Sequence, residues 1–446
     1  MEKNLTEGSV LKNIIFFSAP YLLSYFLQTL YGMADLFIIG RFGSVADITA
    51  VTIGSQVMHM ITVMIVGLAM GTTVTIGHAV GGGRHGDAAR TVGNTVSLFM
   101  PLSILLSAVL LLLVKPLAGV MSTPAEALEG TRHYLTICFI GIPAITAYNI
   151  ISAIFRGMGD SKSPMYFIAA ACAGNILLDY IFMGTLGMGP AGAALGTTIS
   201  QALSVVIALV CMVKRDMGIK LSAKDFAPGG AIIGRILKIG APIALQDGCI
   251  QIAFIVITII ANRRGLNDAA AVGIVEKLIG IFFLVPSSML SSVSALAAQN
   301  IGAKKPERAK LTLRYAACIA VGFGLAIALV SQFFANALVG IFEDDPKVML
   351  LGGQYLRSYV WDCAFAGVHF CFSGYFCAAG RSGISFLHNI LSIVLVRIPV
   401  AYMASRMFAD TLYPMGWAAP LGSVLSVVIC VIAYVVTERK QSGLRI

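Results

Sequence analysis

Apolar residues come in long blocks along this chain, separated by short breaks that are polar or rich in Gly and Pro. Each block approaches the ~20 residues that an α-helix needs to cross a bilayer. We therefore expect an all-α polytopic membrane protein with twelve membrane-spanning helices. Their approximate ranges are 14–39, 47–76, 92–116, 131–155, 164–186, 191–213, 237–262, 269–298, 311–340, 351–377, 384–407 and 414–436.

The two halves of the chain resemble each other. Phe17–Gly43 corresponds to Ile239–Gly265, 222 positions later, and Gly77–Ala89 corresponds to Ala298–Lys310. Six spans per half is an even number, so the halves are expected to be parallel repeats related by an axis along the membrane normal. We predict an N-terminal six-helix lobe at 1–213, a basic cytoplasmic linker at 214–235 and a C-terminal six-helix lobe at 236–446. Two such lobes facing one another would form the central cleft of an alternating-access transporter.

Composition agrees with a membrane location. The chain is 58% hydrophobic and 12% charged, with a mean hydropathy of +0.87, whereas soluble domains carry about 25% charged residues. The net charge of +10 does not indicate nucleic-acid binding, because most Lys and Arg residues fall at the termini and in the loops after even-numbered spans. By the positive-inside rule, both termini are expected in the cytoplasm.

The fifth span carries two polar side chains that call for an explanation. Asn175 and Asp179 are four residues apart in "AGNILLDYIF" and therefore project from one helix face. A charged group at mid-membrane costs roughly 2.5–3.5 kcal/mol on insertion scales. This face offers oxygen ligands for a small cation, or one carboxylate that binds a proton. The alternative is a pair that only hydrogen-bonds a neighbouring helix.

Three further positions in the first half are candidates for the same site. Asp35 lies about a turn and a half before the end of span 1, and facing Asp179 it would complete a two-carboxylate site able to exchange a proton near neutral pH. Thr197 and Thr198 could add hydroxyl ligands from span 6, although such residues often bond their own backbone. Pro20 breaks the backbone ladder of span 1 and allows a kink.

The second half carries other charges in or near its spans. Adjacent Glu276 and Lys277 point to different faces, and Arg397 could pair with an acid of this lobe, for which a structural role is favoured. The remaining acids are Asp247 and Asp362. No Walker A, GxSxG or HExxH motif and no metal-ligand spacing of His or Cys occurs. We therefore expect no enzyme, no cofactor and no metal beyond a possible Na⁺ at Asp35, Asn175 and Asp179.

Four stretches carry a family resemblance. They are "APYLLSYFLQTLYGMADLFIIGRFG", "FRGMGDSKSPM", "GNILLDYIF" and "GPAGAALGTTISQ". With the repeat, they resemble the MATE (multidrug and toxic compound extrusion) family over essentially the whole chain. The resemblance implies a V-shaped two-lobe fold. It also implies export of organic, often cationic compounds in exchange for H⁺ or Na⁺.

The resemblance also implies a coupling-ion site in the first lobe, made by Asp35, Asn175, Asp179 and Thr197 or Thr198. Asn149 or Ser152 would add a polar group from span 4, and Pro20 would be the bending point of span 1. Because "PIALQDGCIQIAF" and "CAFAGVHFCF" lack acids at the matching positions, the chain resembles the DinF-like branch more than the NorM branch.

The expected protein is a monomer in the inner (cytoplasmic) membrane that contacts lipid and takes small organic substrates. The alternative function is a flippase for lipid-linked oligosaccharides from the wider superfamily. That function favours several basic residues in the central cavity, whereas only Lys277 and Arg397 lie deep in spans here.

Overall fold

The computed structural model describes residues 4–121, 123–214 and 218–441, and within these ranges the chain is helical with no β-strand. Two compact units form, the first mainly Ile15–Ala244 and the second mainly Leu245–Ile301 with Lys305–Ile446. The lobes and linker expected from the repeat divide the chain differently and stay a prediction. Residues 215–217 of that linker lie outside the described residues.

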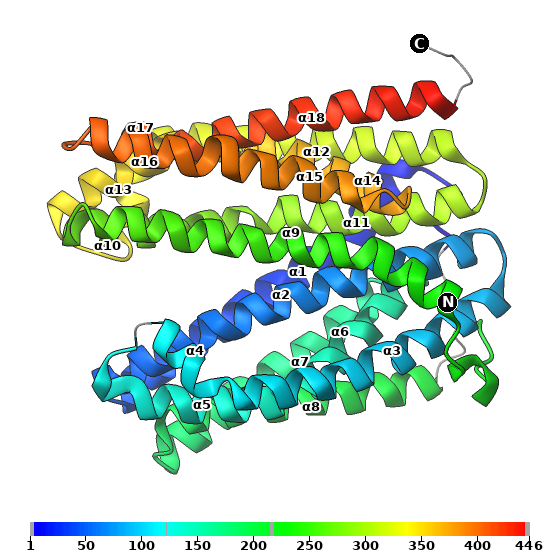
Figure 1. Ribbon diagram of the computed structural model, residues 1–446, viewed down its shortest axis with the longest axis horizontal. Coiled ribbons are helices and arrows are strands. Elements are labelled where there is room, and N and C mark those ends of the chain that lie inside the picture. The colour runs from blue at the N-terminus through cyan, green and yellow to red at the C-terminus, as the bar shows by residue number, and fades with distance from the viewer. Residues whose placement is uncertain (1–3, 122, 215–217, 442–446) are drawn as a thin grey trace. The chain divides into compact units, whose positions relative to one another are not determined.

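The described part of the first half of the chain contains eight α-helices (Figure 1). They are α1 (Val10–Phe42), α2 (Val45–Gly81), α3 (His85–Leu112), α4 (Val114–Val120), α5 (Leu128–Ile140), α6 (Ile142–Gly157), α7 (Lys162–Asp179) and α8 (Gly189–Lys214). A π-helical segment, Tyr180–Thr185, continues α7 directly after Asp179. Such segments are rare and are frequent at functional sites.

The second half repeats this helical pattern (Figure 1). Its helices are α9 (Gly230–Asn262), α10 (Leu266–Phe282), α11 (Leu284–Gly302), α12 (Pro306–Gly340), α13 (Pro346–Tyr359), α14 (Asp362–Ala378), α15 (Ser382–Ser392), α16 (Ile398–Met407), α17 (Tyr413–Gly416) and α18 (Ala418–Gln441). A π-helical segment, Ile393–Arg397, joins α15 to α16.

Fewer helices than expected are single, uninterrupted spans. Among the described residues, ten helices are long and apolar enough to cross a membrane, and the pair α5–α6, bent by 49°, makes eleven. The predicted span 351–377 falls on α13 and α14, which have 14 and 17 residues and are interrupted around Val360 and Trp361. Gly141 stands at the other bend, where a Cβ atom would lie only 2.6 Å from Thr198 Cγ2. Glycine thus allows α8 to approach the bend closely.

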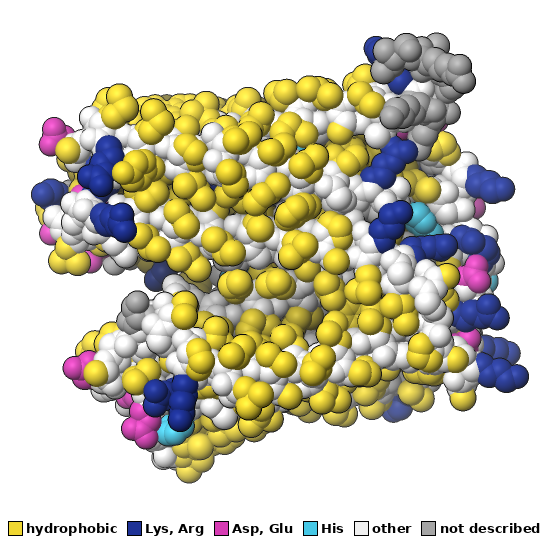
Figure 2. Space-filling model, viewed as in Figure 1, with side chains coloured by type: hydrophobic (Ala, Val, Ile, Leu, Met, Phe, Trp, Pro, Cys, Tyr) yellow, Lys and Arg dark blue, Asp and Glu magenta, His cyan; other side chains and the backbone are white. Residues whose placement is uncertain are grey.

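The surface of each unit is suited to lipid. Large apolar side chains such as Phe333 and Ile104 are 80% and 60% exposed. Figure 2 shows apolar side chains covering the middle of the visible face of each unit, with charged side chains at the helix ends. The interior, by contrast, contains many small polar residues, among them Thr72, Ser292 and Ser373.

Candidate functional site

Three helices of the first unit bring the predicted polar residues together. Asp35 comes from α1, Asn175 and Asp179 from the end of α7, and Thr197 from the start of α8. The Thr197 hydroxyl donates to Asp35 Oδ2 over 3.3 Å, and Asn175 Nδ2 lies 3.5 Å from Thr197 Oγ1. The carboxyl groups of Asp35 and Asp179 are close enough to interact electrostatically. We call these four residues the carboxylate cluster.

Both acids and the amide of the carboxylate cluster are buried, and several of their oxygen atoms lack hydrogen-bond partners among the described residues. Asp35, Asn175 and Asp179 are 4%, 1% and 0% exposed. Neither oxygen of Asp179 has a hydrogen-bond partner in the described part of the chain, and Asp35 Oδ1 and Asn175 Oδ1 also lack one. A buried acceptor left unpaired costs about 1–3 kcal/mol, and more when it is charged. The cluster therefore has several acceptors free for a proton or a small cation.

Gly196 on α8 makes room for Asp179, a feature that the sequence did not suggest. A Cβ atom at this position would clash with Asp179 Oδ1 and lie 3.1 Å from Asp179 Cγ. Glycine is thus needed for the close packing of α8 against the carboxylate. The stretch "GPAGAALGTTISQ" was a candidate because of its threonines, whereas the role of Gly196 in it depends on a contact between α7 and α8.

The other candidates from the first half occupy different surroundings. Thr198 Oγ1 is buried with no hydrogen-bond partner in the described part of the chain, and it faces Gly141 at the α5–α6 bend rather than the carboxylates. Asn149 Nδ2 donates to Ile145 O over 2.8 Å within its own helix. Ser152 is fully buried, and its hydroxyl has no partner among the described residues. Pro20 lies inside α1, and its carbonyl accepts from Ser24 Oγ at 2.8 Å.

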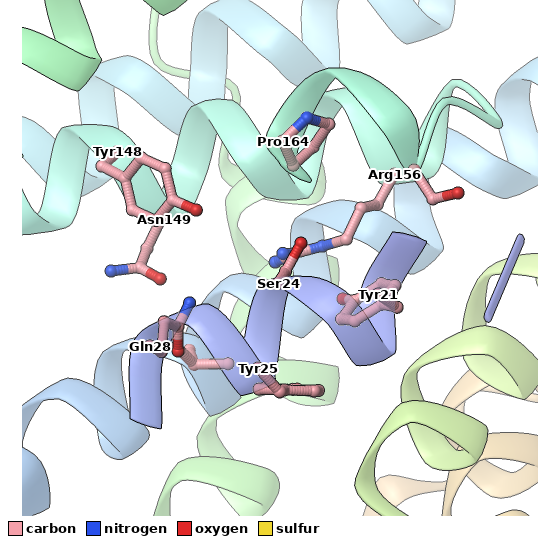
Figure 3. Close-up of a pocket in the computed structure, with 10 residues that line it drawn as sticks. Tyr21, Ser24, Tyr25, Gln28, Tyr148, Asn149, Arg156 and Pro164 are labelled. Atoms are coloured by element: carbon pink, nitrogen blue, oxygen red, sulfur yellow. The ribbon is translucent and has the colours of Figure 1, made fainter. Parts of the chain in front are cut away.

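A small pocket of about 20 Å³ lies between α1, α6 and α7, close to Pro20 in the sequence (Figure 3). Its lining includes Tyr21 and Gln28 from α1 and Asn149 and Arg156 from α6. The Arg156 guanidinium stacks over the Tyr21 ring at 5.0 Å, and Figure 3 shows its side chain pointing toward α1. The sequence pattern assigned Arg156 to the loop after span 4. Its place one residue beyond the apolar block 131–155 was the only sign that it could belong to the helix.

The second unit contains a buried ion pair. Arg397 Nη2 lies 3.1 Å from Asp362 Oδ2, with side chains 11% and 0% exposed. Glu276 accepts from Thr258 Oγ1 at 3.3 Å, and neighbouring Lys277 is exposed on a different face. Asp247 is half-buried on α9. In this unit the buried base Arg397 is thus paired with an acid, Asp362.

Two buried histidines lie on α14 and α15. Their rings are 5.3 Å apart, and each contacts a serine, His369 with Ser423 at 3.3 Å and His388 with Ser373 at 3.0 Å. Among the described residues no three His, Cys, Asp or Glu side chains gather as a metal site would require.

Known proteins resemble this chain over most of its length. The MatE family model matches twice, at residues 20–181 and 242–403. The probable multidrug resistance protein YpnP of Bacillus subtilis is 29% identical over 402 residues, 90% of each chain. The FAD transporter of Shewanella oneidensis is 25% identical, covering 95% of this chain and 93% of that protein. The multidrug export protein MepA of Staphylococcus haemolyticus is 23% identical, covering 91% and 89%.

Solved structures share the fold. A crystal structure of MATE in complex with MaL6 has a TM-score of 0.90 at 23% identity and covers 99% of this chain and 98% of that one. A MOP superfamily transporter from Pyrococcus furiosus gives a TM-score of 0.90 at 22% identity with the same coverage.

Proposed function

Because the chain belongs to the MatE family, a family of transporters rather than enzymes, we propose that it is a secondary active exporter of small organic compounds in exchange for H⁺ or Na⁺. Relatives named as multidrug resistance or export proteins support this function. The observation that carries the proposal is the carboxylate cluster, which buries two acids with several unpaired oxygens and no described base beside them.

The carboxylate cluster suits a cation that binds and leaves in every transport cycle. Two like charges in one buried site repel, so at least one must be neutralised by a proton or a bound cation. Asp35, Asn175 and Thr197 lie on three different helices. Occupancy of the site therefore changes which packing of these helices is favoured, and substrate export follows from that difference in stability.

The repeat supports a twelve-span architecture. The two family matches begin at residues 20 and 242 and end at 181 and 403, so they are offset by 222 positions, as Phe17–Gly43 and Ile239–Gly265 are. Counting α5–α6 and α13–α14 as one bent span each gives twelve. We propose two parallel six-helix lobes, 1–213 and 236–446, joined by the linker 214–235 in the V-shaped arrangement of the family.

We further propose the DinF-like branch, because Asp362 is paired with Arg397 and so is a poor site for a second coupling cation. The protein would be a monomer, surrounded by lipid, in a cytoplasmic membrane with both termini in the cytoplasm. A lipid-linked oligosaccharide flippase is not favoured, because that function needs several basic residues in the central cavity and Arg397, one of the two deep in spans, is neutralised by Asp362.

The test is substrate efflux from proteoliposomes under a pH gradient or a sodium gradient, each imposed alone. Wild-type protein should export a cationic dye with one gradient, and Asp179→Asn should abolish the gradient dependence while leaving the protein folded. Gradient-driven export that persists at the wild-type rate in Asp179→Asn would refute the role of the cluster.

A further inference from the structure

A second hollow of the first unit lies away from the carboxylate cluster. It has a volume of about 400 Å³ and is lined by the end of α2, the start of α3 and the start of α9. Pockets that bind small molecules commonly measure about 300–1,000 Å³. By the positive-inside rule these loops are on the cytoplasmic side. We call this hollow the arginine pocket.

Three arginines from three chain segments line the arginine pocket, and one acid does so among the described residues. Arg84 follows α2, Arg90 lies in α3 and Arg235 in α9, while the acid is Asp87. Asp87 is already paired with Arg84 at 3.4 Å. The guanidinium groups of Arg90 and Arg235 have no hydrogen-bond or ion-pair partner among the described residues, although Asp225 acts on Arg90 at longer range. The lining therefore carries excess positive charge.

The start of α9 adds hydrogen-bond donors to the same pocket. Gly229, Gly230 and Ala231 line it, and α9 begins at Gly230 with no acidic residue in its first turn. The first N–H groups of a helix have no intrahelical partner and favour anions. Arginine guanidinium groups bind phosphate oxygens in a bidentate manner. Because Asn94 accepts from the Gly229 N–H, the amides of Gly230 and Ala231 are the ones that converge with the arginines on one volume.

The segment before α9 that positions these amides is held in place by hydrogen bonds to α3. Asn94 Oδ1 accepts from Gly229 N at 2.6 Å, and Asn94 Nδ2 donates to the carbonyls of Asp225 and Ala227 at 3.2 and 3.3 Å. Ser97 Oγ donates to Phe226 O at 2.6 Å. Asn94 is 2% exposed, so it clamps the segment before α9 onto α3 from inside. The pocket is thus organised before a ligand arrives.

We propose that the arginine pocket binds a phosphate group with net negative charge, supplied by an anionic lipid headgroup or by a soluble phosphate. Anionic lipids are enriched in the cytoplasmic leaflet, and basic pockets between membrane helices bind their headgroups. A bound phosphate ties α9 to α2 and α3. This site is independent of the proposed transport function and of the carboxylate cluster.

The test measures thermal unfolding of the purified full chain in neutral detergent. Phosphatidylglycerol, zwitterionic phosphatidylcholine and inorganic phosphate are titrated separately into wild type, Arg90→Gln/Arg235→Gln and the control Arg314→Gln. Arg314 is also exposed, but it lies on α12, outside the pocket. All three proteins should unfold at similar temperatures without ligand, because the replaced side chains are exposed.

A saturable rise in the wild-type midpoint with phosphatidylglycerol, lost in the double variant and kept in Arg314→Gln, supports a lipid headgroup site. The same pattern with inorganic phosphate supports a soluble ligand. The proposal is overturned when phosphatidylcholine works as well as phosphatidylglycerol, when the double variant responds like wild type, or when no probe shifts wild type.

Discussion

Replacing Gly196 by alanine tests whether the position of the Asp179 carboxylate determines coupling. The new Cβ would clash with Asp179 Oδ1 and lie 3.1 Å from Cγ, whereas the Asp179 backbone nitrogen is 3.4 Å away. The 3.4 Å contact with the backbone is ordinary packing, so the side chain rather than the helix must move. Restoring a normal separation to the oxygen requires a shift of about 1 Å, and misplacement of that size costs up to about 10²-fold in activity.

The effect on stability should be small, because two contributions oppose each other. Overpacking a buried site costs about 1–3 kcal/mol, and replacing glycine by alanine within a helix returns about 1 kcal/mol. We therefore expect Gly196→Ala to fold, with a free energy of unfolding within about 2 kcal/mol of wild type. Its gradient-driven efflux should nevertheless fall by about one to two orders of magnitude, because the Asp179 carboxylate is displaced by about 1 Å.

The assay compares efflux from proteoliposomes and unfolding in detergent for wild type, Gly196→Ala and the control Gly174→Ala. Gly174 is on α7 beside Asn175, but a Cβ there would meet only Ser200 and Leu203 at 3.8 and 3.9 Å. The control should transport normally. If Gly196→Ala exports at the wild-type rate with normal expression, the position of Asp179 does not matter for coupling and the reasoning fails.

Three further outcomes follow from the same contacts. Asp35→Asn should fold and lose gradient-driven efflux, as Asp179→Asn should; retained drug resistance at normal expression would contradict this. Thr197→Val should weaken cation dependence more than Thr197→Ser, measured as the cation concentration for half-maximal efflux, because only serine keeps the hydroxyl that donates to Asp35; equal effects would argue against that bond. Arg397→Met should lower the free energy of unfolding by about 3–5 kcal/mol, because Asp362 is left buried and unpaired. Adding Asp362→Asn should restore part of that free energy; no restoration would mean that the ion pair is not what stabilises this region.

Much of the helical layout could be predicted from hydropathy, because bilayer thickness fixes the length of an apolar helix. The interruptions within the spans could not be predicted in this way. Gly141 and the Val360–Trp361 pair lie inside apolar blocks, and hydropathy does not distinguish a straight span from a bent one. At α13 the backbone is also held by a neighbour, since Gln332 Nε2 donates to Arg357 O at 2.9 Å and Arg357 Nε donates to Gln332 O at 3.1 Å. Such reciprocal bonds depend on packing rather than on local sequence.

Only part of the candidate site could be predicted from the sequence, for a similar reason. The spacing of Asn175 and Asp179 places both on one face of a helix, and that inference needs only helix geometry. The approach of Asp35 to Thr197 joins residues far apart in sequence, as does the fit of Gly196 around Asp179. Arg156 was missed because a basic residue at the end of an apolar block ordinarily belongs to a loop, whereas here it stacks on Tyr21 inside a pocket.

The carboxylate cluster of the first unit and the Arg397–Asp362 ion pair of the second unit balance buried charge differently, and this contrast supports our proposal that coupling uses the cluster. In the second unit Asp362 has Arg397 at 3.1 Å, so the pair is neutral in sum without any bound ion. In the first unit Asp35 and Asp179 face each other with an amide and a hydroxyl but no described base. Only the first arrangement requires a cation from outside to offset its charge. A charge that must be offset from outside can change during a cycle, whereas an internal ion pair cannot do so without leaving a buried charge uncompensated.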